Sequence, residues 1–360
     1  MICHALNSGI DISTLSLVAA SLEYFQFRSV LMILACCIDR NYVELAGVML
    51  RSVHQFGNVG AVQFWILADR LTEADKANIA AAADREVTFV DMTKEMAGRI
   101  ENLKTTSYWS RSIYGRLLMP EIVDETCERI VYLDADVIVK GDISHLFETD
   151  LQDNLVAACC TVGGAKLNRR LGRNDDELYF NSGVLVLDVK KWRNEGLTRK
   201  AIELLQINNY TFMDQDVLNV LSTGRVLSLE WIWNAQRGND FADAVIVHFI
   251  HAKPDSVECQ HPEKDFYLNL RAQTPWGRRR LRTKTDRRLR KLGHSLKYRL
   301  RYMRQLFSIS VDEMLRRLTA MGANTESLVS TVENLAWLRE RWWLPGSLNP
   351  PPTASASALR

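Results

Sequence analysis

The feature that most constrains the fold is a regular alternation of apolar and amphipathic segments near the start of the chain. The segments 30–38, 62–67 and 87–92 are short and largely apolar, as in strands that are buried on both faces. The segments between them, 43–55 and 71–83, have helical patterns, and the second opens with Thr72 as its N-cap. Strands that alternate with helices predict an α/β fold with a mostly parallel central sheet.

The pattern continues downstream. Further strands are expected at 129–139, 154–160, 182–189 and 244–250. Helices are expected within 107–122 and over 197–206 and 216–222, and the sequence FMDQD before the last of these is expected to be a loop.

Basic residues are concentrated near the C-terminus. Residues 277–304 hold thirteen Lys and Arg and a single acidic residue, Asp286, whereas the rest of the chain carries a net charge of about −10. Leucines at roughly helical spacing among the arginines predict a basic amphipathic helix. The expected regions are an N-terminal extension (1–28), a main α/β domain (29–275), a basic helical C-terminal region (276–346) and a disordered tail (347–360).

Cysteine usage and hydropathy indicate the compartment. The seven cysteines include two adjacent pairs within apolar runs, and no CxxC spacing suggests a zinc or redox site. An odd number with adjacent pairs favours a reducing compartment, so we expect a cytoplasmic protein. The longest apolar run is far shorter than the roughly 20 residues that span a bilayer. The first residues lack the pattern of a secretion signal, and secretion is not expected.

Two aspartates interrupt the apolar sequence RIVYLDADVIVKGD. Side chains alternate along a strand, so Asp134 and Asp136 are expected to point the same way and to offer two oxygen ligands to a hard divalent cation. A second pair, Asp214 and Asp216, follows in the sequence MDQD. Either pair by itself is equally consistent with a cap on a helix or loop.

Other polar residues follow expected strands. His248 ends the last apolar strand, with His251 and Lys253 just beyond; imidazole is a suitable third ligand for manganese, and lysine neutralises phosphate. An isolated histidine at a strand end is more often an ordinary surface residue. Asp39 and Asn41 follow the first strand, where α/β folds often bind nucleotides. Neither GxGxxG nor a P-loop is present, so a simple polar turn is equally plausible there.

Taken together, these motifs resemble glycosyltransferase family 8, which includes bacterial lipopolysaccharide galactosyl- and glucosyltransferases and glycogenin. The matching segments, in family order, are ILACCIDRNY, SIYGRL, VYLDADVIVKGDISHLFETDL, YFNSGVLVLDVKKWR, MDQDVLN and HFIHAKP, over roughly residues 31–255. The resemblance implies a GT-A type, Rossmann-like nucleotide-sugar domain. It also implies retaining transfer of a hexose, galactose or glucose, from a UDP-sugar to a hydroxyl group of a glycan such as lipopolysaccharide.

The resemblance assigns roles to individual residues. Asp134, Asp136 and His248 would hold Mn²⁺ (or Mg²⁺) against the two phosphates. The remaining donor contacts would come from Asp39, Asn41, Arg116, Asn181 and Lys253. Asp214 and Gln215 would lie at the anomeric carbon as the catalytic residues. Whether one of these two is a nucleophile or only stabilises positive charge is left open, with front-face attack by the acceptor hydroxyl favoured.

Three positions depart from the family pattern. His251 occupies the place of a glycine and Asp255 that of a tryptophan, in a segment that normally ends in Lys-Pro-Trp. Thr161 stands where some relatives have a sugar-binding aspartate. These departures leave the identity of the donor sugar open.

The basic region and two other functional classes complete the hypotheses. Residues 276–307 are expected to bind an anionic membrane surface at the inner face of the membrane, rather than nucleic acid; a solvated helix face is the alternative. A haloacid-dehalogenase-like phosphotransferase would use Asp134 as nucleophile, but Ile138 stands where that class has Thr or Val. The third hypothesis is an inactive transferase-like binding module.

Overall fold

The structure is a computed structural model, which describes residues 31–92, 99, 103, 111–161, 163–238 and 241–286. All of them belong to the first of two compact units, Met1–Lys291. The expected N-terminal extension, the disordered tail and most of the basic C-terminal region lie outside the described residues, so those boundaries stay predictions. In the described part of the chain, no helix is long and apolar enough to cross a membrane.

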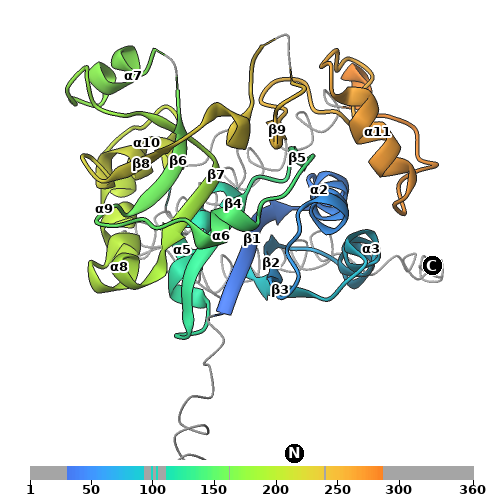
Figure 1. The fold of residues 1–360 in the computed structure, drawn as a ribbon, viewed down its shortest axis with the longest axis horizontal. Helices are drawn as coiled ribbons and strands as arrows, with labels where there is room; N and C mark the ends of the chain where they lie inside the picture. The colour runs from blue at the N-terminus through green and yellow to red at the C-terminus, as the bar shows by residue number, and fades with distance from the viewer. Residues whose placement is uncertain are drawn as a thin grey trace, which may run out of the picture. The chain divides into compact units, whose positions relative to one another are not determined.

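The elements alternate as expected (Figure 1). The strands among the described residues are β1 (Leu31–Asp39), β2 (Gln63–Asp69), β3 (Val87–Asp91), β4 (Cys127–Leu133), β5 (Val137–Val139), β6 (Val156–Cys160), β7 (Phe180–Asp188), β8 (Val226–Leu229) and β9 (Ile246–His248). The α-helices there are α2 (Val43–Phe56), α3 (Glu73–Ala83), α5 (Gly115–Ile122), α6 (Ser144–Glu148), α7 (Ala165–Arg170), α8 (Val189–Asn194), α9 (Leu197–Ile207), α10 (Met213–Leu221) and α11 (Lys264–Ala272). Two 3₁₀ turns, Arg111–Tyr114 and Trp231–Asn234, are also described.

The central sheet is mixed but mostly parallel, as predicted. In the described chain it has seven strands in the order β3-β2-β1-β4-β7-β6-β8. The pairs β3–β2, β2–β1, β1–β4 and β6–β8 are parallel. β7 runs antiparallel to both of its neighbours, β4 and β6. The carboxyl ends of β1, β2 and β4 meet at one edge, where Asp39 lies opposite Asp69. Open α/β sheets bind their ligands at this edge.

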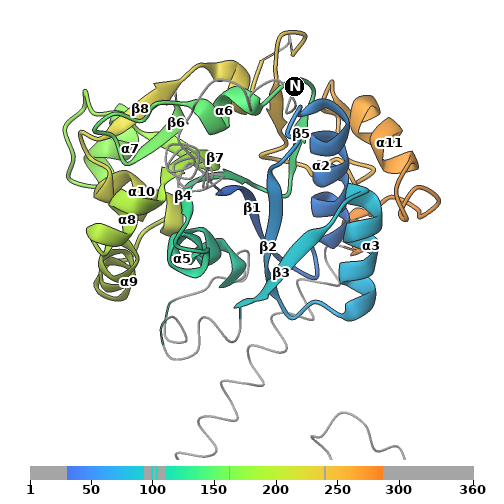
Figure 2. The same ribbon diagram turned by 60° about the horizontal axis from the view of Figure 1, so that its bottom comes forward.

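Helices cover both faces of the sheet, and each face has its own apolar core. Alternate residues of β1 enter different cores: Leu34 and Cys36 pack with α2 and α3, whereas Ile33 and Ala35 pack with α5 and with α8 to α10. Figure 2 shows α2, α3 and α11 on one side of the sheet and α5, α8 and α9 on the other. As predicted, the apolar runs of the sequence are uninterrupted because the strands are buried on both faces of the sheet.

The predicted N-cap at Thr72 is confirmed. Its side chain accepts a hydrogen bond from the Asp75 amide, and the Asp75 carboxylate accepts one from the Thr72 amide, which completes a capping box at the start of α3.

The prediction of one continuous strand over 129–139 is wrong. β4 ends at Leu133, residues 134–136 form a turn, and β5 pairs with β9 in a separate two-stranded sheet. The chain changes sheets here because the Asp134 amide makes a last bond to the Gly183 carbonyl of β7, at 2.8 Å, while Val137 already pairs with His248. The two aspartates therefore lie where the chain leaves the main sheet.

The prediction of a loop at FMDQD is also wrong. α10 begins at Met213, so Asp214, Gln215 and Asp216 form its first helical turn. The Asp216 carboxylate accepts a hydrogen bond from the Phe212 amide, at 2.9 Å. Acidic residues near a helix N-terminus satisfy free amides and favour the helix dipole, which explains why this polar sequence is helical.

Candidate active site

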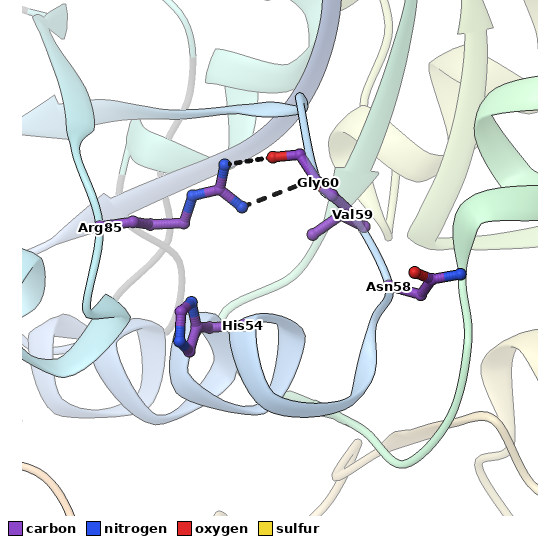
Figure 3. A pocket seen from close by; sticks show the side chains of 5 residues that line it. All are labelled: His54, Asn58, Val59, Gly60 and Arg85. Atoms are coloured by element: carbon purple, nitrogen blue, oxygen red, sulfur yellow. Dashed lines mark hydrogen bonds between the residues drawn. The ribbon is translucent and has the colours of Figure 1, made fainter.

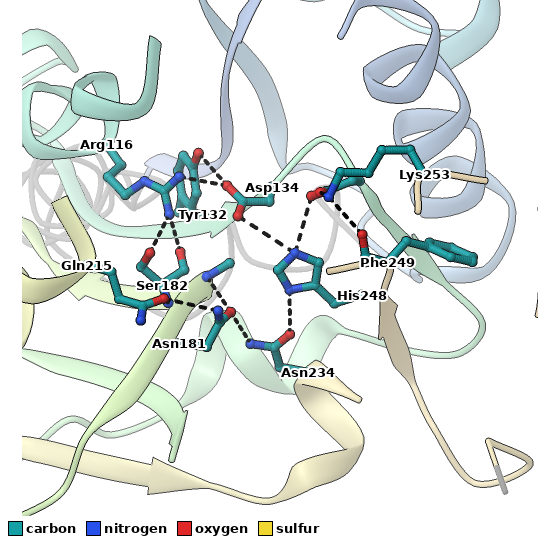
Figure 4. A network of polar contacts seen from close by, with 12 residues as sticks. Arg116, Tyr132, Asp134, Asn181, Ser182, Gln215, Asn234, His248, Phe249 and Lys253 are labelled. Atoms are coloured by element: carbon teal, nitrogen blue, oxygen red, sulfur yellow. Dashed lines mark hydrogen bonds and ion pairs between the residues drawn. The ribbon is translucent and has the colours of Figure 1, made fainter. Parts of the chain in front are cut away.

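A network of polar side chains lies at the end of β4 and β9 (Figure 4). It draws on segments far apart in the sequence: Arg116 of α5, Asp134 and Asp136 of the β4–β5 turn, Asn181 and Ser182 of β7, Asp214 and Gln215 of α10, Asn234 of the second 3₁₀ turn, His248 of β9 and Lys253 beyond it. The fold thus gathers eight of the predicted site residues in one place, together with Ser182 and Asn234, which were not predicted.

Asp134, Asp136 and His248, here called the metal group, have the geometry of a cation site. One ligand atom of each lies within 4.8 Å of the other two. His248 Nε2 is 3.2 Å from Asp136 Oδ1 and 3.9 Å from Asp134 Oδ2. Ligands about 2.1 Å from one ion lie about 3 Å apart at a right angle. Two carboxylate oxygens and an imidazole at this spacing suit Mn²⁺ or Mg²⁺.

Lys253 neutralises one member of the metal group. Its ammonium group contacts Asp136 Oδ2 and donates to the Phe249 carbonyl at 2.8 Å. Burial by itself raises the pKa of Asp136, but the charges of Lys253 and His248 outweigh burial and hold that pKa well below its usual range. Asp136 is therefore ionised, as a metal ligand must be. The predicted contact of Lys253 with a diphosphate stays a prediction.

The ring of His248 is oriented by a neighbouring amide. Its Nδ1 lies 3.0 Å from Asn234 Oδ1. Because the amide oxygen can only accept, Nδ1 donates to it, and Nε2 is left to face Asp134 and Asp136, where it would bind a metal. Gly183 leaves room for this ring, since a Cβ there would lie 2.3 Å from His248 Cε1. This contact explains the glycine of the FNSG sequence.

Arg116 connects the two Asp-x-Asp motifs. Its Nη2 donates to Asp134 Oδ1 at 2.8 Å, and its Nε lies 3.1 Å from Asp214 Oδ2. Its Nη1 donates to the hydroxyl and the carbonyl of Ser182. The Tyr132 ring lies 4.6 Å from the guanidinium carbon, and the Tyr132 hydroxyl donates to Asp134. An arginine held by so many partners is a rigid, fixed positive charge between the motifs.

Asp214 is a buried carboxylate whose pKa is raised toward neutral pH. Burial raises its pKa, the charge of Arg116 lowers it and that of Asp134 raises it, with the result that the pKa of Asp214 is raised to about 6. At neutral pH the carboxylate is ionised and lies against Arg116.

Gln215 is held at both ends of its amide. Its Oε1 accepts from Asn181 Nδ2 at 3.0 Å and from the Ser182 amide at 3.2 Å. Its Nε2 donates to the Tyr179 hydroxyl at 3.0 Å. Both atoms therefore have partners within the protein, and the side chain has a defined orientation.

A continuous chain of hydrogen bonds joins the metal group to Gln215 (Figure 4). His248 Nδ1 donates to Asn234, Asn234 Nδ2 donates to Asn181 Oδ1 at 3.0 Å, and Asn181 Nδ2 donates to Gln215. Each amide accepts on one side and donates on the other. The metal side and the sugar side of the predicted site are thus one hydrogen-bonded unit.

Asp216, by contrast, points away from the metal group. Its side chain is fully buried, and its oxygens accept from the Tyr179 hydroxyl at 2.6 Å and from Arg170 Nη2 at 2.9 and 3.1 Å. Its partners fix the start of α10, and with it the position of Asp214 and Gln215.

The predicted nucleotide loop joins β1 to α2. Asp39 Oδ1 accepts from the Asn41 amide at 2.7 Å, and Asp39 Oδ2 from Asn41 Nδ2 at 3.3 Å. Tyr42 follows, and burial together with the charge of Asp136 raises the pKa of Tyr42 to about 12. The charge of Asp136 thus acts on Tyr42, the residue that follows Asn41.

The three departures from the family pattern have different surroundings. The side chain of His251 is exposed, so its bulk lies in solvent. Thr161 is half-buried, and its amide donates to the Tyr179 carbonyl at 2.7 Å. Asp255 is buried and forms an ion pair with Arg282, at 2.8 Å.

Several residues of the site were not predicted from sequence. They are Tyr42, Tyr132, Tyr179, Ser182 and Asn234. Ser182 and Tyr179 flank Asn181 in the YFNSG motif, which was a usable signal. Asn234 lies in the sequence WIWNAQ, where nothing marks the asparagine as buried.

A separate surface pocket lies at the opposite edge of the sheet, before β2 and β3 (Figure 3). It is lined by His54, Asn58, Val59, Gly60 and Arg85. Arg85 donates to the carbonyls of Val59 and Gly60, and Asn58 donates to Asp142. None of the predicted site residues lines this pocket.

Comparison with known proteins gives the chain a family. The model described as "Glycosyl transferase family 8" matches residues 33–255. A lipopolysaccharide 1,2-glucosyltransferase of Escherichia coli K12 is 35% identical over 202 residues, which cover 55% of this chain and 60% of that protein. A lipopolysaccharide 1,3-galactosyltransferase of Salmonella typhimurium is 25% identical over 287 residues, 74% of this chain and 83% of that protein. The matched part thus spans only about three fifths of the length of the E. coli relative.

Solved structures agree with the sequence comparisons. The galactosyltransferase LgtC with donor and acceptor sugar analogues has a TM-score of 0.57 and 25% identity, over 68% of this chain and 96% of that chain. An active-site variant of LgtC has a TM-score of 0.58 at the same identity and coverage. The matched region 33–255 contains all ten predicted site residues and is well over half of the chain. The chain belongs to glycosyltransferase family 8.

Proposed function

We propose that this chain transfers a hexose from a UDP-sugar to a hydroxyl group of a glycan, with retention of the anomeric configuration and with a divalent cation. The observation that carries the proposal is that Arg116 contacts both Asp134 of the metal group and Asp214, while a chain of hydrogen bonds joins His248 to Gln215. The names of the bacterial relatives support lipopolysaccharide, or another cell-surface glycan, as the acceptor.

The donor side of the site supplies positive charge. When UDP leaves the anomeric carbon, negative charge grows on the diphosphate and positive charge on the sugar. Bound at the metal group, Mn²⁺ or Mg²⁺ would act as a Lewis acid on the diphosphate. Lys253 and Arg116 add fixed positive charge beside it, in a buried setting where such charge is effective. Asp39 and Asn41 would contact the uridine.

The sugar side supplies negative charge and hydrogen-bonding groups. Asp214 would stabilise the positive sugar, and Asn181 and Gln215 would lie around it. Because Gln215 Oε1 already accepts two hydrogen bonds, it is a poor nucleophile. This supports front-face attack, in which the acceptor oxygen bonds to the anomeric carbon on the face that the diphosphate leaves.

The most direct test is a screen of UDP-sugars with Mn²⁺, scored by donor hydrolysis, since it requires no acceptor. We expect UDP-glucose or UDP-galactose to be hydrolysed by the wild type and not by Asp136→Ala. No hydrolysis of any UDP-sugar, together with no binding of Mn²⁺·UDP by calorimetry, would support the inactive binding module instead. The phosphotransferase alternative has lost its support, because the chain belongs to a glycosyltransferase family.

We propose further that the region 276–307 binds the anionic inner surface of the cytoplasmic membrane. Basic residues near such a surface contribute about 1 kcal/mol each. Trp276 is buried, so a truncation that tests this must keep the chain through Asp286, the last described residue. The truncated protein should no longer sediment with phosphatidylglycerol vesicles while donor hydrolysis continues. Undiminished sedimentation would contradict the assignment.

A further inference from the structure

The first residues of the basic region fold back onto the main domain. The Trp276 side chain packs on Gly47 of α2 so closely that a Cβ at Gly47 would lie 2.3 Å from the ring. Arg271 donates to Glu44 through Nε and to the Arg279 carbonyl through Nη2, both at 2.7 Å. Residues 276–279 are therefore anchored on α2, at some distance in sequence from the residues that they touch.

Beyond these anchors, Arg282 lies between two loops. Its amide donates to the Asp255 carbonyl at 2.8 Å, and its carbonyl accepts from the Val257 amide at 2.9 Å. Its Nη1 is 2.8 Å from Asp255 Oδ2, and its Nη2 donates to the Asn41 carbonyl at 2.9 Å. One guanidinium thus joins the loop after β1 to the loop after β9.

Both loops carry predicted contacts to the UDP part of the donor. Asp39 ends β1 and Asn41 lies in the loop that follows, and the loop after β9 holds Lys253. We propose that Arg282 and Asp255 form a latch that fixes these two loops relative to each other, so that Arg282 is a positioning residue for donor binding. The proposal rests on the proposed function for the identity of the donor, but not for the contacts.

The chemistry of the pair supports this role. Asp255 is 2% exposed, and a buried carboxylate is tolerated only with a partner. Arg282 supplies that partner and still has a second nitrogen for the Asn41 carbonyl; a lysine offers only a point charge. The latch also accounts for an aspartate where the family pattern has tryptophan. Loops that are ordered before the donor arrives lose less entropy on binding it.

The test compares the wild type with Asp255→Asn/Arg282→Met. The double substitution removes both contacts of the Arg282 guanidinium, to Asp255 and to the Asn41 carbonyl, without leaving a buried charge unpaired. Arg280→Gln is the matched control, because Arg280 belongs to the same segment but pairs with Asp286 at the surface. We expect the double variant to raise Kd for Mn²⁺·UDP and KM for the donor about 10-fold with kcat nearly unchanged, since contacts that only order the site act on binding. For Arg282→Lys, Kd and KM should lie between those of the wild type and of the double variant.

Hydrogen exchange gives a second readout that does not depend on the donor. Peptides that cover residues 39–43 and 253–257 should exchange faster in the double variant than in the wild type or in Arg280→Gln. Unchanged exchange in both peptides, or unchanged affinity for Mn²⁺·UDP, overturns the latch. A wild type that binds no Mn²⁺·UDP overturns the proposed function instead, and the exchange data then decide the latch alone.

Discussion

The chain contains two Asp-x-Asp pairs with the same spacing and different surroundings. Asp134 and Asp136 lie in a turn between two strands, and each directs an oxygen toward His248 Nε2, at 3.9 and 3.2 Å. Asp214 and Asp216 lie in the first turn of α10, where each residue turns about 100° from the last. Residues two apart on a helix therefore point to nearly opposite sides.

The difference shows that spacing alone does not define a metal site. The first pair shares one cation-sized space, and the histidine that completes it comes from a neighbouring strand. In the second pair each carboxylate has its own arginine, Arg116 for Asp214 and Arg170 for Asp216. The backbone conformation decides whether two carboxylates act together or separately.

The largest expected effect comes from breaking the first pair. Asp136→Ala removes a ligand of the metal group, and the charge stabilisation that a metal supplies is several kcal/mol. We expect donor hydrolysis with Mn²⁺ to fall by about 10³-fold or more. Steady-state rates check this, with circular dichroism as the control for folding. Wild-type turnover that persists in EDTA would contradict the metal assignment.

The second pair should make the stability of the fold depend on pH, through Asp214. The pKa of Asp214 is raised to about 6 by burial, so the folded state holds this proton more tightly than the unfolded chain. Its ionisation therefore destabilises the fold as pH rises from about 4 to about 6, by up to about 3 kcal/mol. In EDTA, Asp214→Asn should gain stability over the wild type across this range, by urea unfolding. Parallel profiles would show that Asp214 titrates normally.

A smaller effect is expected from Asn234, which joins the metal group to the sugar side of the site. Asn234→Ala removes the partner of His248 Nδ1, and loss of such a group weakens metal binding about 10- to 100-fold. Asn234→Asp keeps an oxygen for the histidine but loses the bond to Asn181, so it should retain more metal affinity. Mn²⁺ titration measures both. Equal affinity in Asn234→Ala and the wild type would mean that the ring needs no orienting partner.

The smallest effect should follow Tyr179→Phe. The hydroxyl donates to Asp216 and accepts from Gln215, and loss of such bonds costs about 1–2 kcal/mol of stability. Metal affinity should not change, because the metal group is untouched. Urea unfolding and Mn²⁺ titration together test this. A change in metal affinity as large as that of Asn234→Ala would mean that the two pairs are more tightly coupled than the contacts indicate.

Much of the fold could be predicted from the sequence because its signals are local. The apolar run of β1 and the N-cap at Thr72 act within a few residues, and both predictions are confirmed. The strand over 129–139 was predicted wrongly because its two halves are equally apolar, and only the pairing of Val137 with His248 reveals the break. The helical start of α10 depends on how Asp216 satisfies the Phe212 amide, which a loop-like composition concealed.

The site divides in the same way. Residues within motifs, such as Asp134 and Gln215, could be named in advance from the resemblance. Asn234 and Arg282 could not, because their partners lie far away in sequence and neither stands in a recognised motif. Such residues act through a chain of contacts, and these contacts exist only once the fold has formed.

A Mn²⁺ titration followed by electron paramagnetic resonance, in the presence of UDP, tests directly which aspartate pair holds the metal. We expect one bound Mn²⁺ in the wild type and in Asp214→Asn, and none in Asp136→Ala at the same concentrations. Loss of Mn²⁺ binding in Asp214→Asn with retention in Asp136→Ala would reverse the roles of the two pairs and contradict the assignment of the metal group.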